Sequence, residues 1–152
     1  MRILTLMLLL YSLAFSYQKG DTLSEDIQKK LDIKADKIYI IDFFASWCPS
    51  CEKEMPYISK VNEKIDKTKI KIIGIGVDED IKKGQKFQKK LKDRGELNFQ
   101  VIDDPKNLII KEFNPIGMPA LFYIKDKKVV KTIFGAVDDI DKIILSDLKE
   151  LE

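Results

Sequence analysis

The sequence predicts one α/β domain: a mixed central β-sheet flanked by helices, with an N-terminal helix and a central helical insertion. Three observations support this fold class. Residues 37–45, K-I-Y-I-I-D-F-F-A, form an apolar run typical of a central strand that is buried on both faces. Helical and strand-like patterns then alternate over residues 48–113. Lastly, two strand-like runs at 120–124 and 129–134 are joined by four polar residues, which predicts an antiparallel hairpin. Alternation followed by a hairpin is typical of a sheet with both parallel and antiparallel pairs.

The other elements follow from local patterns. Leu23, Ile27 and Leu31 recur every four residues and predict a short amphipathic helix, with Thr22 and Glu25 as its N-terminal capping pair. The later elements are expected in this order: a helix from residue 48 to 65, a strand at 70–77, a surface helix at 81–94 with a solvated basic face, a strand at 99–102, a helix capped by Asp104 and reaching Phe113, the two hairpin strands, and a final amphipathic helix at 140–151.

Composition agrees with one soluble domain. The chain has 152 residues, of which 45% are hydrophobic and 34% are charged, so it can bury a core. Its formal net charge is only +2, which gives no reason to expect a nucleic-acid partner.

The first sixteen residues have the pattern of a signal peptide. Arg2 precedes an apolar run at residues 3–15, and Ala14-Phe15-Ser16 places small residues where a signal peptidase cleaves. The run is shorter than the roughly twenty residues of a membrane span, although an uncleaved membrane anchor is the alternative. We therefore divide the chain into a signal peptide (1–16), a polar segment with a short helix (17–36) and the main domain (37–152). The predicted location is periplasmic or otherwise extracytoplasmic, where disulfides persist.

The chain has two cysteines, Cys48 and Cys51, and no histidine. A disulfide between them would close too short a loop to be an effective staple. A structural zinc site needs four Cys or His ligands, which this chain does not have. The remaining use is reversible redox chemistry, in which one thiolate attacks a partner's disulfide and the other thiol resolves the product.

The pair lies where the first predicted strand ends and the following helix begins. A helix N-terminus has unpaired N–H groups and a positive dipole end, both of which stabilise a thiolate. Cys48 gains most from this position and is the predicted nucleophile, while Cys51, one turn later, is the predicted resolving thiol. Pro49 is tolerated because its missing N–H falls where the helix has no internal acceptor.

The stretch D-F-F-A-S-W-C-P-S-C, together with Pro56 and the later Gly117-Met118-Pro119, resembles the thioredoxin superfamily. The resemblance covers residues 37–151. The helix-bearing segment at 80–113 is similar to the exported TlpA/ResA branch of thiol-disulfide reductases, many of which serve cytochrome c maturation.

This resemblance implies a thioredoxin fold and an exported oxidoreductase that reduces protein disulfides through Cys48 and Cys51 without a cofactor or a metal. It implies client proteins, apocytochrome c among them, and a membrane thiol carrier as electron donor. A monomer is expected. Pro119 matches the cis proline that lies against the cysteine pair in this superfamily. Met118 would then offer its backbone N–H and C=O to an extended client segment, although it could also be an ordinary core residue.

Two acids are candidates for tuning the pair. Asp42 matches the buried acid of thioredoxin and is the only charged residue in an apolar run, where burial should raise its pKa. It could take the proton of Cys51, or it could merely face a polar gap. Glu54 lies three residues after Cys51 on the same helix face and matches a tuning glutamate of the TlpA/ResA branch, but it could also be a surface charge.

Trp47, the only tryptophan, is expected to cover the thiol pair and to shape a docking surface with Pro49, Met118 and Pro119; plain packing is the alternative. Other activities also stay open. A disulfide-forming oxidase or isomerase would use the same fold. A thiol peroxidase is disfavoured, because Ile41 and Ala45 stand where its P-x-x-x-T/S-x-x-C pattern has Pro and Thr or Ser. A binding module without activity would not need all of these residues.

Overall fold

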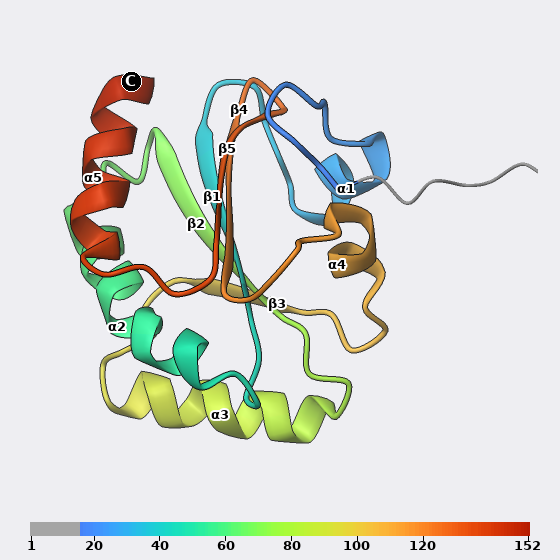
Figure 1. Ribbon diagram of the computed structural model, residues 1–152, viewed down its shortest axis with the longest axis vertical. Coiled ribbons are helices and arrows are strands. Elements are labelled where there is room, and N and C mark those ends of the chain that lie inside the picture. The colour runs from blue at the N-terminus through green and yellow to red at the C-terminus, as the bar shows by residue number, and fades with distance from the viewer. Residues whose placement is uncertain (1–15) are drawn as a thin grey trace, which may run out of the picture.

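The computed structural model describes residues 16–152 and contains a five-stranded sheet between helices (Figure 1). The strand order is β3-β2-β1-β4-β5. The central strand β1 (Ile38–Phe44) pairs in parallel with β2 (Ile70–Gly76) and antiparallel with β4 (Ala120–Lys125). At the edges, β3 (Gln100–Asp103) is parallel to β2 and β5 (Lys128–Phe134) is antiparallel to β4. The predicted mixed sheet is confirmed.

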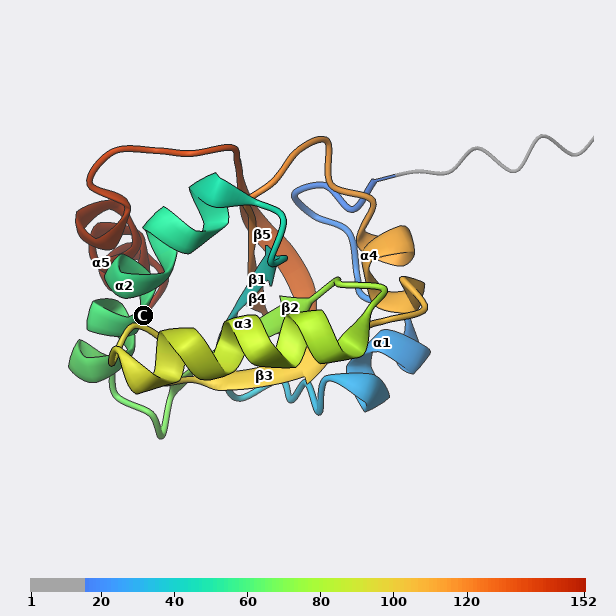
Figure 2. The same ribbon diagram turned by 90° about the horizontal axis from the view of Figure 1, so that it is seen from below.

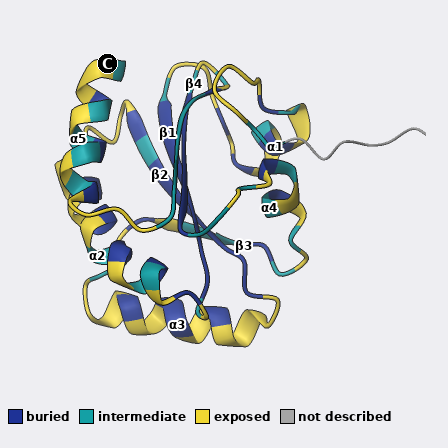
Figure 3. Ribbon diagram, in the orientation of Figure 1, coloured by how far each residue is buried: buried dark blue, intermediate teal, exposed yellow. Residues whose placement is uncertain are grey.

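The helices cover both faces of the sheet. Figure 2 shows α2 (Pro49–Lys64) and α5 (Ile140–Leu151) on one side, and α1 (Glu25–Lys30) and α4 (Leu108–Phe113) on the other. Phe87 and Leu91 of α3 (Ile81–Asp93) join the core cluster on the α2 side. The rest of α3 is mostly exposed (Figure 3), as predicted for a lysine-rich surface helix.

Every residue of β1 is buried, which explains why it reads as a continuous apolar run. Because side chains alternate along a strand, Ile40, Asp42 and Phe44 share the face covered by α2 and α5. Close packing there also explains Gly74, the β2 residue in register with Asp42. A Cβ on Gly74 would lie 2.8 Å from a ring carbon of Phe44, so the neighbouring phenylalanine requires glycine.

The start of α1 differs from the prediction. The N-cap is Ser24, whose hydroxyl accepts a hydrogen bond from the backbone N–H of Ile27. Thr22 instead forms an isolated antiparallel bridge with Lys128 of β5. The predicted pair of Thr22 and Glu25 was therefore wrong, because pairing with the sheet edge holds Thr22 in extended backbone.

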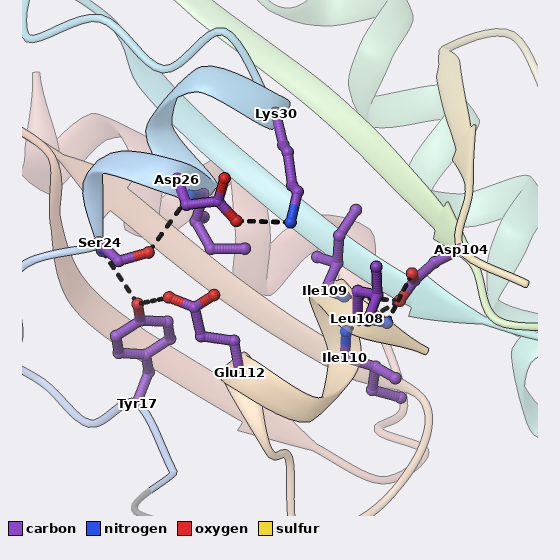
Figure 4. A network of polar contacts seen from close by, with 10 residues as sticks. Tyr17, Ser24, Asp26, Lys30, Asp104, Leu108, Ile109, Ile110 and Glu112 are labelled. Atoms are coloured by element: carbon purple, nitrogen blue, oxygen red, sulfur yellow. Dashed lines mark hydrogen bonds and ion pairs between the residues drawn. The ribbon is translucent and has the colours of Figure 1, made fainter. Parts of the chain in front are cut away.

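Helix α4 begins later than predicted, at Leu108, after a left-handed Asn107. The Asp104 carboxylate still serves this helix, since it accepts the N–H groups of Leu108, Ile109 and Ile110 at 2.8–3.0 Å (Figure 4). The other end of α4 is tied to the N-terminal segment. Tyr17 donates its hydroxyl to Glu112 at 2.8 Å (Figure 4). Its ring lies 5.0 Å from that of Phe113. These contacts fix α4 and therefore the loop that follows it.

The predicted hairpin is present. Its two turn residues, Asp126 and Lys127, have φ of 51° and 64°. Positive φ at both central residues is typical of the type I′ turn, whose twist matches that of paired strands.

Nearly all of the expected signal peptide at 1–16, with its apolar run at residues 3–15, lies outside the described residues. Within residues 16–152, no helix is both long enough and apolar enough to cross a membrane.

Candidate active site

Cys48 and Cys51 form a disulfide at the N-terminus of α2, with their Cα atoms 5.3 Å apart. Cys48 is the N-cap residue, and its Sγ accepts a hydrogen bond from the backbone N–H of Cys51 at 3.2 Å. Pro49 occupies the first turn, as predicted, and exposes its ring. Cys48 is 7% exposed and Cys51 only 2%, so the first sulfur is the more accessible one. When the pair is reduced, this geometry stabilises a thiolate on Cys48.

A groove of about 750 Å³ has Trp47, the residue directly before Cys48, in its lining. The loop of residues 115–118 lines the same groove. Trp47 is 64% exposed and Ile116 is 83% exposed, which is unusual for large apolar side chains. The bond between Met118 and Pro119 is cis, as the resemblance implied. Met118 also packs against the core cluster that contains both cysteines. Trp47, Met118 and Ile116 thus form one apolar rim beside the cysteine pair.

Asp42 and Glu54 come together under α2. Asp42 is 2% exposed and Glu54 is 7% exposed, and Asp42 Oδ1 and Glu54 Oε1 have no hydrogen-bond partner. Burial raises the pKa of Asp42 well above its ordinary value, and the nearby charge of Glu54 raises it further. Burial also raises the pKa of Glu54 to about 7. The sequence correctly placed Asp42 inside, and the surface alternative for Glu54 is wrong.

Two further polar side chains of this region were not predicted from the sequence. Tyr123 of β4 and Asp147 of α5 each have a buried oxygen without a partner. With those of Asp42 and Glu54 they are the four such side-chain atoms among residues 16–152. Burial, then the charges of Asp147 and Glu54, raises the pKa of Tyr123, so its phenol stays protonated. Asp147 Oδ1 forms an ion pair with Lys131 Nζ at 2.6 Å.

Both residues left a signal in the sequence. A tyrosine in the middle of a buried strand needs a partner for its hydroxyl. Asp147 stands on the apolar face of α5, three residues after Ile144 and one before Leu148. Neither signal, however, shows that Tyr123 lies close to both Asp147 and Glu54. The result is a polar region enclosed between β1, β4, α2 and α5.

This region opens to solvent beside Glu54. A groove of about 370 Å³ between α2 and the loop after β5 is lined by Glu54, Ser50, Lys53, Tyr57 and residues 136–140. The arrangement can therefore accept a proton in the interior and exchange it with water at Glu54. Residues 16–152 contain no cluster of His, Cys, Asp and Glu that could hold a metal ion.

The raised pKa of Glu54 predicts a pH dependence of stability. The folded state keeps this proton up to about pH 7, while the unfolded chain loses it near 4.5. Between these values the folded state binds more protons, so stability falls as the pH rises, by about 3 kcal/mol for a group that titrates independently. Urea unfolding of the oxidised protein at pH 5 and pH 8 should show this fall, and Glu54→Gln should remove a large part of it. Asp42 remains in this variant, and because its pKa is also raised in the folded state, it too lowers the free energy of unfolding as the pH rises.

The matched control is Glu63→Gln, because Glu63 is an exposed glutamate on the same helix. Between pH 5 and pH 8, this variant should lose as much unfolding free energy as the wild type does. An equally steep fall in Glu54→Gln would show that Glu54 does not hold a proton in the folded state.

The chain is similar to known thiol-disulfide oxidoreductases. The chain is 34% identical over 110 residues to the thiol-disulfide oxidoreductase ResA of Bacillus thuringiensis subsp. konkukian, an alignment that covers 70% of this chain and 61% of ResA. It is 27% identical over 97 residues to the sporulation thiol-disulfide oxidoreductase A of Bacillus subtilis, covering 63% of this chain and 58% of that protein. The chain thus spans about three fifths of the length of these curated relatives.

Solved structures confirm the thioredoxin-like fold. A crystal structure assigned to the thiol:disulfide interchange protein DsbE of Chlorobium tepidum superposes with a TM-score of 0.75 at 20% identity, over 89% of this chain and 98% of that one. The AhpC/TSA family matches residues 14–133, which is most of the sequence. The resemblance to ResA-like proteins is confirmed, and the chain belongs to the AhpC/TSA family.

Proposed function

We propose that this protein is a thiol-disulfide oxidoreductase that reduces disulfides of client proteins outside the cytoplasm. The observation that carries the proposal is the cysteine pair itself. Cys48 Sγ lies at the positive end of α2, next in the chain to Trp47 of the groove, while the more deeply buried Cys51 lies one turn further into the helix. This is the arrangement that thiol-disulfide exchange needs: an accessible nucleophile with a second thiol behind it.

The reaction has two steps. In the first, the Cys48 thiolate attacks one sulfur of a client disulfide, so that a Cys48–client disulfide forms and the other client sulfur leaves as a thiolate. In the second, Cys51 loses its proton and attacks Cys48 Sγ, which restores the disulfide between Cys48 and Cys51 and releases the second client thiolate. Two electrons pass to the client, and an external dithiol must reduce the pair again.

Asp42 is the proposed acceptor of the Cys51 proton. Its side chain is on the sheet face that packs against both cysteines, and its raised pKa makes it a stronger base than an ordinary carboxylate. The charge of Glu54 raises the pKa of Asp42 further, and Glu54 also lines a groove that opens to solvent. The proton can leave through Glu54 to the groove that this residue lines.

The docking surface consists of Trp47, Pro49, Ile116 and the backbone of Met118, where an extended client segment would add as a short strand beside cis Pro119. The signal-peptide pattern of residues 1–16 supports export or a membrane anchor. As the resemblance to the TlpA/ResA branch implies, we propose clients in cytochrome c maturation and a membrane thiol carrier as electron donor. We propose that the protein acts as a monomer.

Reduction of insulin with dithiothreitol as the electron source tests this function. The wild type should speed the precipitation of insulin chains well above the rate with dithiothreitol alone, because Cys48 is placed to attack protein disulfides. A parallel assay of hydrogen peroxide consumption separates the peroxidase alternative. Peroxide turnover without insulin reduction would contradict the proposal, and so would activity in neither assay.

A further inference from the structure

The loop before Cys48 is held by a residue from another strand. Asp78, two residues beyond the end of β2, is 6% exposed. One carboxylate oxygen accepts the backbone N–H of Ser46 at 2.9 Å, and the other accepts the Ser46 hydroxyl. Both oxygens of a buried carboxylate are therefore committed to a single residue, two positions before the nucleophile.

Backbone hydrogen bonds on both sides of Ser46 hold the same loop. The backbone N–H of Val77 bonds to the carbonyl of Phe44 at 3.0 Å and extends the connection of β1 and β2 past their ladder. The N–H of Cys48 bonds to the carbonyl of Ala45 at 3.1 Å. Between these two backbone bonds, the contact with Asp78 fixes Ser46. Trp47 and Cys48 follow it directly.

Helix α3 is shaped to admit the Asp78 side chain. Gly84 faces Asp78, and a Cβ at Gly84 would lie 3.0 Å from Asp78 Cβ and 3.2 Å from Oδ2. A side chain there would push on the carboxylate that holds Ser46. Burying a carboxylate is costly unless it is hydrogen-bonded. The two hydrogen bonds that Asp78 accepts from Ser46 compensate for its buried position beside α3.

We propose that Asp78 is a positioning residue of thiol-disulfide exchange: it clamps Ser46 and so fixes Trp47 and Cys48 at the rim of the client groove. The inference rests on the proposed function. Ser46, Trp47, Asp78 and Met118 all line the same groove. A client disulfide must approach Cys48 Sγ along the line of the new bond while its chain contacts Trp47 and Met118. A loop free to move would lose this alignment, and misplacement by about 1 Å can cost up to ~100-fold in rate.

Four variants test the clamp in insulin reduction. Asp78→Ala removes both acceptors and should slow reduction about tenfold, within the range known for misplaced groups. Ser46→Ala removes only the hydroxyl and should have a smaller effect. The double variant should be no slower than Asp78→Ala, because both changes break one contact. Asp78→Asn keeps an acceptor for the Ser46 N–H and should recover most of the rate.

Two readouts separate positioning from other roles. Alkylation of reduced Cys48 by iodoacetamide needs no docking surface, so Asp78→Ala should change it by less than about twofold, whereas misplacement of a docked client costs far more. Trp47 is the only tryptophan, so its fluorescence anisotropy reports the mobility of the loop without any activity. Asp78→Ala should lower the anisotropy and Asp78→Asn should restore it.

Asn62→Ala is the control for lost stability. Asn62 is buried in the last turns of α2 and bonds to Asn98 at 3.0 Å, far along the helix from the disulfide. It should unfold at a lower temperature while reducing insulin at the wild-type rate. Equal slowing by Asn62→Ala, additive effects of the Ser46 and Asp78 variants, or unchanged anisotropy in Asp78→Ala would each overturn the clamp. A wild type that does not reduce insulin would instead overturn the proposed function.

Discussion

Replacing Cys51 with serine should turn this protein into a covalent trap for its clients. Cys48 Sγ keeps its place at the start of α2 and can still attack a disulfide, but the residue that releases the client is gone. Reduced Cys51→Ser protein mixed with insulin should give an adduct on non-reducing gels that dithiothreitol releases. Catalytic turnover should fall to the rate of dithiothreitol alone.

The matched variant is Cys48→Ser, which leaves only Cys51. Because Cys51 is 2% exposed and lies one helical turn behind Cys48, few adducts should form. Both variants should fold, since a bond across three residues adds little constraint to the unfolded chain. Equal amounts of adduct from the two variants would show that the roles of nucleophile and resolving thiol are not divided as proposed.

Much of the fold could be predicted because its signals are local. The apolar run of β1, the helical spacing after Cys48 and the polar turn of the hairpin each depend on a few adjacent residues. The helix starts were harder. Thr22 and Ser24 are both good N-caps, and only the bridge between Thr22 and β5 decides between them. Distant contacts of this kind have no local pattern.

The same distinction applies to the site. The cysteine pair, Trp47 and Asp42 could be found because their spacing along the chain carries the information. The contact of Ser46 with Asp78 joins residues 32 positions apart, and no local pattern in either segment predicts it. The exposure of Ile116 depends on the loop after α4, which the structure places at the rim of the groove. Residues that act across elements become visible only when the elements are packed.

The surroundings of Cys48 predict a pair with a low reduction potential. Oxidising members of this fold stabilise the reduced form through a strongly favoured thiolate. Here the two residues between the cysteines are Pro49 and Ser50, neither of which is charged, and the chain has no histidine. Asp42 and Glu54 lie on the same side of the sheet as the pair, and when ionised they oppose a thiolate. The helix N-terminus is the main favourable influence on Cys48, so its thiolate should be only moderately stabilised.

A moderately stabilised thiolate makes the disulfide hard to reduce and the dithiol a good electron donor. The two ends of the scale are about −270 mV for thioredoxin and about −120 mV for DsbA, a difference of about 7 kcal/mol for two electrons. We expect this protein near the thioredoxin end. Asp42→Asn should move the potential toward less negative values, because it removes a buried carboxyl group that opposes the Cys48 thiolate whenever it is ionised.

The direction of electron flow can be measured by equilibrating Cys48 and Cys51 with glutathione and dithiothreitol buffers at pH 7, followed by alkylation to count reduced thiols. A reductant should have a midpoint nearer to about −270 mV than to about −120 mV, so that the pair stays largely oxidised in glutathione buffers and is reduced only by dithiothreitol. A midpoint near the oxidising value would exclude a reductant. The same cysteine pair would then belong to an enzyme that forms disulfides in its clients.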